Sequence, residues 1–386
     1  MGKIKSMKKY IIISGFDIRD NNRGTAALGY GSINFCLQNN YLNEGQEMIN
    51  FIYIKKFWKK EYKDREIEYH TNGKKIKHKI IYIQEWEKRL FDIFNISLPF
   101  TKFGKAIRNL NLIAAINGGD GFSDIYSTKT FYSRLDDIQI AMRKHLPVII
   151  LPQTLGPFKQ QSNYQKAQEI LQYATDVYVR DTKFITELQK MGVKYKLTQD
   201  LSAFMEPEPW DIEIKPNSIG INVSGLAYSN KFRTLSGQFD MYPQLIESII
   251  CHFRDKGHTI YLIPHSYNYN HPEENNDDIV ACKAAYERLK NKENIVLINQ
   301  DLISPQIKYL ISKMSFFIGT RMHANFAAIY THVPLFGLAY SYKFEGAFNA
   351  NGLNGKLQTT MINNIKAEDI KRIIKQIDSV YHQLVQ

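Results

Sequence analysis

The sequence predicts an α/β fold with two doubly wound domains that face each other, and three observations lead to this prediction. Short apolar runs alternate with longer segments of 3.6-residue periodicity, which is typical of parallel strands connected by helices. The alternation stops once, in a proline-containing stretch near the middle, and then starts again. The chain of 386 residues is also longer than one ordinary hydrophobic core requires.

The first half contains six apolar runs that we expect to be strands, with helical segments between them. The expected strands are residues 10–14 (YIIIS), 49–54 (INFIYI), 79–83 (KIIYI), 112–117 (LIAAIN), 147–152 (PVIILP) and 176–179 (DVYV). Helices are expected over residues 25–38, 129–145, 163–174 and 183–192.

A linker is expected at residues 205–217 (MEPEPWDIEIKPN), which contain three prolines and no periodicity. Beyond it, strands are expected at 218–224 (SIGINVS), 259–265 (TIYLIPH), 294–299 (NIVLIN), 315–319 (SFFIG) and 333–340 (VPLFGLAY), and a last helix at 366–385. We therefore predict a first domain over residues 1–207 and a second over 215–386. The last helix is a candidate to cross back to the first domain.

The composition is that of a globular protein, with 44% hydrophobic and 23% charged residues. No apolar run reaches the length of about 18 residues that a transmembrane helix needs. The N-terminal apolar run is too short for a signal peptide and is better explained as a buried strand. Cys36, Cys251 and Cys282 are widely spaced and form no CxxC, so we expect neither a disulfide framework nor a zinc site. A cytoplasmic location follows as the simplest expectation.

Much of the net charge of +12 lies in residues 55–79 (KKFWKKEYKDREIEYHTNGKKIKHK). One interpretation is a solvated hairpin or loop. The other is a patch that contacts a polyanionic substrate or the anionic inner face of a membrane, which would make the protein peripheral there. A nucleic-acid partner is not expected, because no helix-turn-helix, RRM or zinc-finger pattern occurs.

Polar residues follow the expected strands, at the edge where parallel sheets bind ligands. In the first half these are Asn22, Gly118, Gly119, Asp120, Gln153 and Arg180. In the second half they are Ser224, Gly225, His265, Arg321, His323 and Lys343. Cationic or potentially cationic groups recur among them in both domains. A small, multiply charged anion held between the domains explains this distribution.

Arg321 and His323 give the sharpest signal, because they fall where a strand ends and a helix begins. A helix N-terminus carries partial positive charge and binds anions, so two basic side chains there predict a missing acidic ligand.

The weaker signals are also compatible with purely structural roles. The GGDGFSD stretch at 118–124 could form a tight turn and helix cap, and Arg180 could form a local ion pair with Asp181. The absence of GxGxxG and GxxxxGK[ST] disfavours a dinucleotide or P-loop site. Residues 265–277 contain histidines and acids but lack regular metal-ligand spacing, so no metal site is expected.

Six segments, read together, resemble the polysaccharide pyruvyl transferase family. They are GGDGFSDIYS, LPQTLGPF, VYVRDTKF, IGINVSGL, LIPHS and FFIGTRMHANFAAIYTHVPLFGLAYSYKFEG. The resemblance runs in order from about residue 10 to 350, and the GTRxHA segment with its downstream lysine is its most specific part. It implies a GT-B-like pair of Rossmann-like domains and a transferase that places a pyruvate ketal on sugars of cell-envelope polysaccharides.

The resemblance also implies roles for individual residues. His323 would be catalytic, and Arg180, Arg321 and Lys343 would contact phosphoenolpyruvate, with Arg180 counted among the catalytic residues. By their positions at strand ends, Ser224, Gly225 and His265 join the phosphoenolpyruvate site. The remaining strand-end residues, Asn22, Gly118, Gly119, Asp120 and Gln153, form the acceptor or loop side. Asp120 stands where the family pattern usually has a third glycine.

The expected reaction transfers pyruvate from phosphoenolpyruvate to a sugar of a capsular or envelope polysaccharide, or to its lipid-linked precursor. Phosphoenolpyruvate is a co-substrate, no cofactor is expected, and the sequence does not decide whether a metal is required. Two alternatives stay open: a GT-B glycosyltransferase that uses a nucleotide sugar, with Glu345 as the acidic residue for sugar hydroxyls, and a non-catalytic glycan-binding relative.

Overall fold

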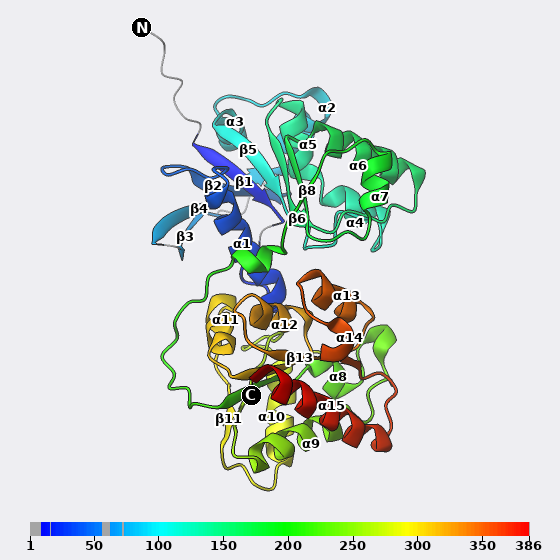
Figure 1. The fold of residues 1–386 in the computed structure, drawn as a ribbon. Coiled ribbons are helices and arrows are strands. Elements are labelled where there is room, and N and C mark those ends of the chain that lie inside the picture. Colours follow the sequence, from blue (N-terminus) through cyan, green and yellow to red (C-terminus); the bar gives the residue numbers. More distant parts are fainter. Residues whose placement is uncertain (1–8, 16, 56–61, 72, 386) are drawn as a thin grey trace. The chain divides into compact units, whose positions relative to one another are not determined.

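The computed structural model describes residues 9–15, 17–55, 62–71 and 73–385, and these form two compact units (Figure 1). The first unit contains the described residues before Asp17 and Leu28–Phe204, and the second contains Asp17–Ala27 and Met205–Gln386. Among the described helices, none combines the length and the apolar character needed to span a bilayer.

The first unit is built on an eight-stranded sheet with the order β3-β4-β2-β1-β5-β6-β7-β8. Its pairings are parallel except for the antiparallel hairpin of β3 and β4 at one edge. The strands are β1 (Tyr10–Ser14), β2 (Glu47–Ile54), β3 (Arg65–Thr71), β4 (Lys74–Gln84), β5 (Leu110–Ala115), β6 (Val148–Gln153), β7 (Asp176–Val179) and β8 (Lys196–Leu197). The central strands are nearly all apolar because helices cover a parallel sheet.

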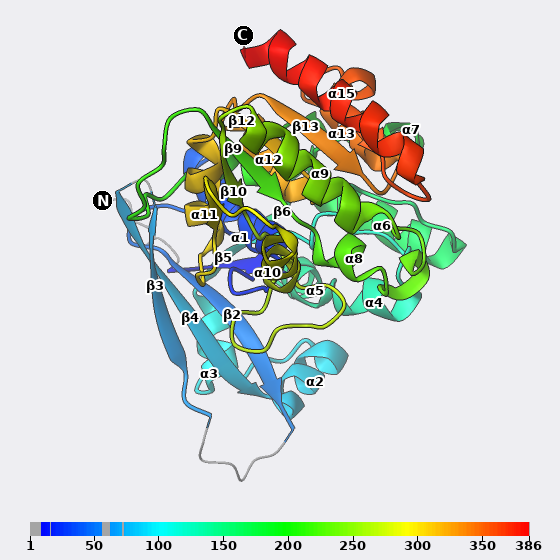
Figure 2. The ribbon, with the colours of Figure 1, turned by 90° about the horizontal axis from the view of Figure 1, so that it is seen from below.

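Helices connect these strands in the first unit. They are α1 (Arg23–Gln38), α2 (Glu85–Phe94), α3 (Lys102–Arg108), α4 (Thr128–Ser133), α5 (Asp136–Arg143), α6 (Gln161–Tyr173) and α7 (Ile185–Lys190), followed by the short helix η1 (Leu201–Phe204). The first residues of α1 belong to the second unit and the rest to the first. Figure 2 shows α2 and α3 beside the part of the sheet formed by β2, β3 and β4.

The second unit has a parallel six-stranded sheet with the order β11-β10-β9-β12-β13-β14. The strands are β9 (Ser218–Asn222), β10 (Thr259–Leu262), β11 (Ile295–Leu297), β12 (Phe316–Gly319), β13 (Leu335–Ala339) and β14 (Thr359–Met361). The chain fills one side of β9 first and then the other, which is the Rossmann order. The order reverses between β9 and β12, and this is where such sheets bind ligands.

The helices of the second unit lie between these strands and at the C-terminal end. They are α8 (Gly225–Ser229), η2 (Arg233–Leu235), α9 (Tyr242–Asp255), α10 (Asp278–Arg288), α11 (Ser304–Ser312), α12 (Met322–Ile329), α13 (Lys343–Ala350), α14 (Gly355–Gln358) and α15 (Ala367–Val385). The last helix, α15, packs on α9 and β13 of its own unit (Figure 1).

The structure differs from the expected elements in a few places. The helix expected over 129–145 is two helices, α4 and α5, because the chain turns between Ser133 and Asp136. The strands β3, β8 and β14 were not predicted as separate elements; all three are at or near sheet edges. Residues 17–27, expected in the first domain, belong to the second unit, because Asn22 pairs with Ser266.

Candidate functional site

In the second unit, the loops after β9 and β12 lie together where the strand order reverses. The two strands are neighbours, and Gly319 pairs with Asn222 at their ends. The backbone N–H of Arg321 donates to the Asn222 side-chain oxygen over 2.8 Å. Arg321, which follows β12, therefore lies at the same edge of the sheet as Ser224 and Gly225, which follow the neighbouring strand β9. The sequence predicts these residues at this edge.

Asp278 is the first residue of α10, and its side chain is fully buried. It binds the loops that follow β9, β10 and β12. Its Oδ1 accepts from the Gly225 N–H (2.8 Å) and from Nε and Nη2 of Arg321 (3.1 and 2.7 Å). Its Oδ2 accepts from the N–H groups of His265 and Ser266 (both 3.0 Å) and from the Asn222 side chain (3.2 Å). One carboxylate thus fixes the ends of β9, β10 and β12.

Arg321 is the residue before α12, and its charge is balanced inside its own unit. Its Nη2 also donates to the backbone and side-chain oxygens of Asn276 (2.9 and 2.8 Å). Burial alone lowers the pKa of Arg321, but the Asp278 carboxylate raises it above its ordinary value. The sequence predicts that an acidic ligand is missing at the start of α12. This prediction is incomplete, because the Asp278 carboxylate already supplies a negative charge there. A ligand that binds Arg321 would therefore meet a guanidinium whose charge is already balanced by the Asp278 carboxylate.

His323 stands in the first turn of α12 against the start of α1. A Cβ placed on Gly24 would lie 2.6 Å from both Cγ and Nδ1 of the imidazole, so the close approach requires glycine. The ring also meets the edge of Phe326, with centroids 5.6 Å apart. Gly24 is itself fixed by its N–H, which donates to the Asn22 side chain over 3.0 Å. The imidazole is therefore held in one place by the chain around it.

His265 and Ser224 bring polar atoms without hydrogen-bond partners to the same strand ends. His265 is 4% exposed, and its Nδ1 has no partner within the described part of the chain. Burial lowers the pKa of His265 well below its ordinary value, and the nearby His323, Arg321 and Arg23 lower it further. Ser224 is fully buried, and its hydroxyl likewise has no partner among the described residues. Such atoms are costly in a folded protein unless a ligand or water satisfies them.

Residues 17–27 close this region from one side. The N–H of Arg23 donates to the His265 carbonyl (3.1 Å), and the N–H of Tyr267 donates to the Asn21 carbonyl (2.9 Å). The Arg23 side chain donates to the carbonyl of Leu302 (2.8 Å) and pairs with Asp301 (2.9 Å). These contacts explain why the segment belongs to the second unit.

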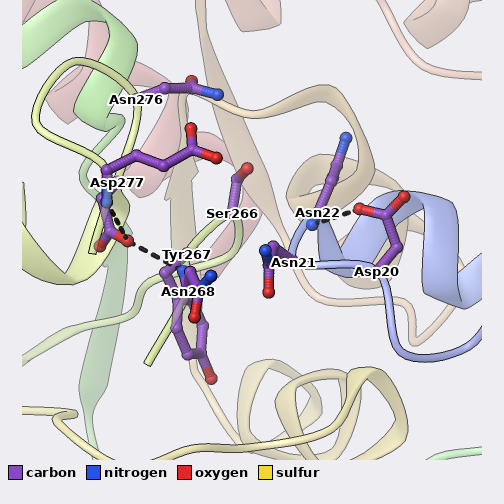
Figure 3. A pocket seen from close by; sticks show the side chains of 9 residues that line it. Asp20, Asn21, Asn22, Ser266, Tyr267, Asn268, Asn276 and Asp277 are labelled. Carbon is purple, nitrogen blue, oxygen red and sulfur yellow. Dashed lines mark hydrogen bonds between the residues drawn. The ribbon is translucent and has the colours of Figure 1, made fainter. Parts of the chain in front are cut away.

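A polar cavity of about 190 Å³ opens beside these contacts. Its lining consists of Asp20, Asn21, Asn22, Ser266, Tyr267, Asn268, Glu273, Asn276 and Asp277. In Figure 3, Asn22 and Asp20 lie on one side, Asn276 and Asp277 on the other, and Ser266 between them. The cavity adjoins the basic residues, because Asn276 binds Arg321 and Asn22 binds Gly24 next to His323. Burial and nearby carboxylates raise the pKa of Asp20, although the Asn22 N–H opposes the shift.

Lys343 begins α13, one strand further along the same sheet edge. Its side chain is exposed, and within the described chain it makes no hydrogen bond or ion pair with Arg321 or His323. Lys343 thus lies on the ligand-binding edge of the sheet but does not contact Arg321 or His323 through a hydrogen bond or ion pair within the described chain.

In the first unit, Arg180 follows β7 and is also tied to a buried carboxylate. Its Nη1 donates to Asp200 over 2.6 Å, and its Nε donates to the Thr154 hydroxyl over 3.1 Å. Asp181 is further away, at 3.9 Å from Nε, so the local pair with Asp181 is the weaker one. Burial alone lowers the pKa of Arg180, but Asp200, with Asp181 and Asp120, raises it above its ordinary value.

The turn at Gly118–Gly121 lies next to Arg180. A Cβ on Gly119 would be 2.8 Å from Arg180 Nη1. The Asp120 side chain accepts a hydrogen bond from the Tyr126 hydroxyl over 3.0 Å. Gln153 is buried and bridges strands, since its side chain accepts from the Asn117 N–H (3.0 Å) and donates to the Ala115 carbonyl (2.9 Å). Gln153 therefore supports the sheet here.

Several residues of these sites were not singled out from the sequence. Asp278, Asn276 and Asp200 are the main ones, and each lies far along the chain from the arginine it binds. Asp278 directly follows Asp277, which caps α10, so the sequence gave no separate signal for Asp278. Within the described residues, no group of three or more His, Cys, Asp or Glu side chains is placed to hold a metal.

Solved structures that align with a TM-score above 0.5 agree with this architecture. The UDP-GlcNAc 2-epimerase from Neisseria meningitidis, bound to UDP-GlcNAc, aligns with a TM-score of 0.51 and 12% identity over 98% of this chain and 94% of that one. The UDP-GlcNAc 2-epimerase from Methanocaldococcus jannaschii aligns with a TM-score of 0.48 and 10% identity over 82% and 86%. E. coli ADP-heptose heptosyltransferase II aligns with a TM-score of 0.44 and 12% identity over 97% and 99%.

At such low identities, a similarity indicates fold and nothing more, and the fold is of the GT-B type. The comparison with curated proteins returns no match. The profile described as "Polysaccharide pyruvyl transferase" matches residues 30–342, most of the chain. The chain therefore belongs to the polysaccharide pyruvyl transferase family.

Proposed function

We propose that this protein transfers pyruvate from phosphoenolpyruvate to two hydroxyls of a sugar and forms a pyruvate ketal. The acceptor would be a cell-envelope or capsular polysaccharide or its lipid-linked precursor. The observation that carries the proposal is the gathering of Arg321, His323, His265 and Ser224 at the switch point of the second unit, in a chain of this family.

The donor suits these residues. Phosphoenolpyruvate carries a carboxylate and a phosphate, which arginine binds with its planar fork and lysine as a point charge. Arg321 and the Ser224 hydroxyl would contact the donor, and Lys343 would approach from the same sheet edge. The neutral His265 would offer its Nδ1 to a donor oxygen or a bound water.

His323 is proposed as the acid–base group. A proton is added to the methylene carbon of phosphoenolpyruvate, and one sugar hydroxyl attacks the cationic C2. Phosphate leaves with its oxygen, the second hydroxyl closes the ring, and the two hydroxyl protons are released. Arg321 holds the donor while the imidazole of His323 exchanges protons, which contributes about 10²–10⁴-fold.

The cavity next to this cluster fits the acceptor better than the donor. Its amides and carboxylates, such as those of Asn22, Asn268 and Glu273, pair well with hydroxyl groups. Its acidic side chains would repel a second anion. We assign it to sugar hydroxyls and place Asn22 on the acceptor side.

The test is phosphate release from phosphoenolpyruvate in the presence of candidate oligosaccharide acceptors, with the ketal methyl group followed by NMR. His323→Ala is expected to lower turnover by about 10²-fold or more and to leave donor affinity nearly unchanged. Arg321→Ala is expected to weaken donor binding. The matched control is His382→Ala, which removes an exposed histidine of α15. Parent-like turnover in His323→Ala would remove this residue from the mechanism.

A thermal-shift comparison separates the competing functions. Stabilisation by phosphoenolpyruvate, and not by nucleotide sugars, is expected for a pyruvyl transferase. Stabilisation by nucleotide sugars alone would indicate a glycosyltransferase. Glycan binding without any phosphate release would indicate a non-catalytic relative.

A further inference from the structure

The first unit carries an exposed apolar surface on α2 and on the loop that leads to α3. Phe100, Ile93 and Phe94 are 72%, 70% and 64% exposed, which places them among the most exposed large apolar side chains of the described chain. Ile96 and Trp86 are each close to half exposed. These five residues lie within one stretch of the chain, residues 86–100, and we call them the α2–α3 surface. Clusters of this kind usually mark a contact site.

The local fold keeps these side chains outside. Trp86 and Ile93 are seven residues apart, about two helical turns, and therefore lie on one face of α2. Phe91 points the other way and is fully buried in the core of the unit. The helix ends at Asn95, whose backbone adopts a left-handed conformation with φ of 55°. The exposure is thus a consequence of helix geometry.

The loop between the two helices is well anchored. The Thr101 side chain caps α3 by accepting from the Gly104 N–H over 3.1 Å. A Cβ on Gly104 would lie 1.9 Å from the Leu98 carbonyl oxygen, so the loop packs directly on the helix. Arg143 donates to the Phe91 carbonyl over 3.0 Å and holds the last turn of α2. Ile96 and Phe100 are therefore presented on a fixed backbone.

The charged residues of the loop and of α3 have one sign, whereas α2 carries Glu85, Glu87 and Asp92 together with Lys88 and Arg89. From Ile93 to Arg108 the sequence has three cations, Lys102, Lys105 and Arg108, and no aspartate or glutamate. All three cations are exposed. Lys102 pairs with Asp64 over 2.9 Å, while Lys105 and Arg108 form no ion pair within the described part of the molecule. The surface thus combines apolar side chains with a positive rim on its α3 side.

The neighbouring hairpin of β3 and β4 is different, although it holds more lysines. Lys75 pairs with Glu68 over 2.7 Å, and Lys79 pairs with Glu47 over 2.8 Å. With Lys77 and Glu66 at 3.8 Å, three of the four lysines of β4 have a carboxylate partner among the described residues, which leave out 56–61 and 72 of the segment 55–79. This hairpin is therefore a weaker membrane-binding candidate than the sequence alone indicated.

We propose that the α2–α3 surface rests on an anionic lipid bilayer, with Phe100, Ile93 and Phe94 inserted at the level of the headgroups. Lysine and arginine side chains around an apolar face are the side chains that bind such interfaces. A second copy of this chain is the less suitable occupant, because each copy brings the same positive rim and a net charge of +12. An anionic bilayer complements both features.

Co-sedimentation of the full chain with vesicles tests this proposal. The vesicles are phosphatidylcholine with about 30 mol% phosphatidylglycerol, and phosphatidylcholine alone. The parent is expected to bind the anionic vesicles and to bind less as salt increases. Ile93→Ser with Phe100→Ser is expected to lower the partition coefficient about tenfold or more. Lys105→Gln with Arg108→Gln is expected to reduce binding to the anionic vesicles only.

Matched controls use other exposed residues outside the surface. Leu197→Ser and Met361→Ser remove exposed apolar side chains outside the surface and should leave binding unchanged. Lys75→Gln tests the paired hairpin and should have little effect. All these side chains are exposed, so circular dichroism should show a folded protein throughout.

Three outcomes would overturn the proposal. The parent does not sediment with anionic vesicles, or Ile93→Ser with Phe100→Ser binds them as well as the parent does. In the third outcome, the parent is a dimer in solution that this double variant dissociates, which would make a second copy the occupant.

Discussion

Arg180 in the first unit and Arg321 in the second follow parallel strands and bind a buried aspartate in nearly the same way. The guanidinium-to-carboxylate distances are 2.6 Å to Asp200 and 2.7 Å to Asp278. The surroundings differ. Asp200 also accepts from the N–H and the hydroxyl of the nearby Ser202, whereas Asp278 accepts from the ends of three strands.

The position in the sheet differs as well. Arg321 follows β12, directly beside the point where the strand order of the second unit reverses. Arg180 follows β7, two strands from β5. The comparison teaches that an arginine at a strand end is not by itself a ligand site. The second unit adds buried polar atoms without described partners beside its ion pair, and we therefore place the donor there.

The largest expected effect is a difference in the free energy of unfolding between variants of Asp278 and of Asp200. Asp278→Ala should lower the free energy of unfolding by about 3–5 kcal/mol, because it leaves a buried guanidinium and several N–H groups unpaired. Asp200→Ala should cost at least about 1 kcal/mol less, since fewer donors lose their partner. Urea unfolding of both variants measures the difference. An equal or larger loss in Asp200→Ala would contradict the special role of Asp278.

The next largest effects are expected at two glycines, Gly24 next to His323 and Gly119 next to Arg180. Gly24→Ala pushes a Cβ into the His323 ring and should cost about 1–3 kcal/mol and most of the turnover. Gly119→Ala brings a Cβ against the ends of the Arg180 and Leu28 side chains, and its φ of +85° adds strain of about 1 kcal/mol. Phosphate release and urea unfolding on both variants measure these effects. Parent-like turnover in Gly24→Ala would show that the position of His323 does not matter.

A smaller effect concerns pH. The lowered pKa of His265 keeps it neutral in the folded chain, while the unfolded chain takes up a proton below about pH 6.5. Stability should therefore fall as the pH drops below about 6.5, by at most about 1.4 kcal/mol per pH unit. Unfolding at pH 7 and pH 5.5 should show a smaller loss in His265→Asn than in the parent. Equal losses would mean that His265 does not titrate this way, and His382→Asn is the exposed control.

The smallest expected change in stability compares two serines. Ser224→Ala should change the free energy of unfolding by no more than about 0.5 kcal/mol, because its hydroxyl has no partner among the described residues. Ser202→Ala removes a 2.6 Å bond to Asp200 and should cost about 1–2 kcal/mol. At the same time, Ser224→Ala should raise the KM for phosphoenolpyruvate several-fold. A large stability loss with unchanged KM would make Ser224 a structural residue.

The sequence predicted the two-part α/β fold and the strand ends well, because buried parallel strands are continuous apolar runs. It also placed Arg321, His265, Ser224 and Gly225 together, since they follow neighbouring strands. It did not reveal Asp278, which lies 43 residues from Arg321 and has the local pattern of a helix start. It assigned residues 17–27 to the wrong unit, because the pairing of Asn22 with Ser266 is a long-range contact without a local signature.

A crystal structure with a non-reactive phosphoenolpyruvate analogue, phospholactate, tests the central claim most directly. We predict that its acidic groups lie within hydrogen-bond distance of Arg321 and the Ser224 hydroxyl, with the His323 imidazole facing the carbon that accepts the proton. Clear density for the analogue elsewhere, with only water between these three side chains, would contradict it.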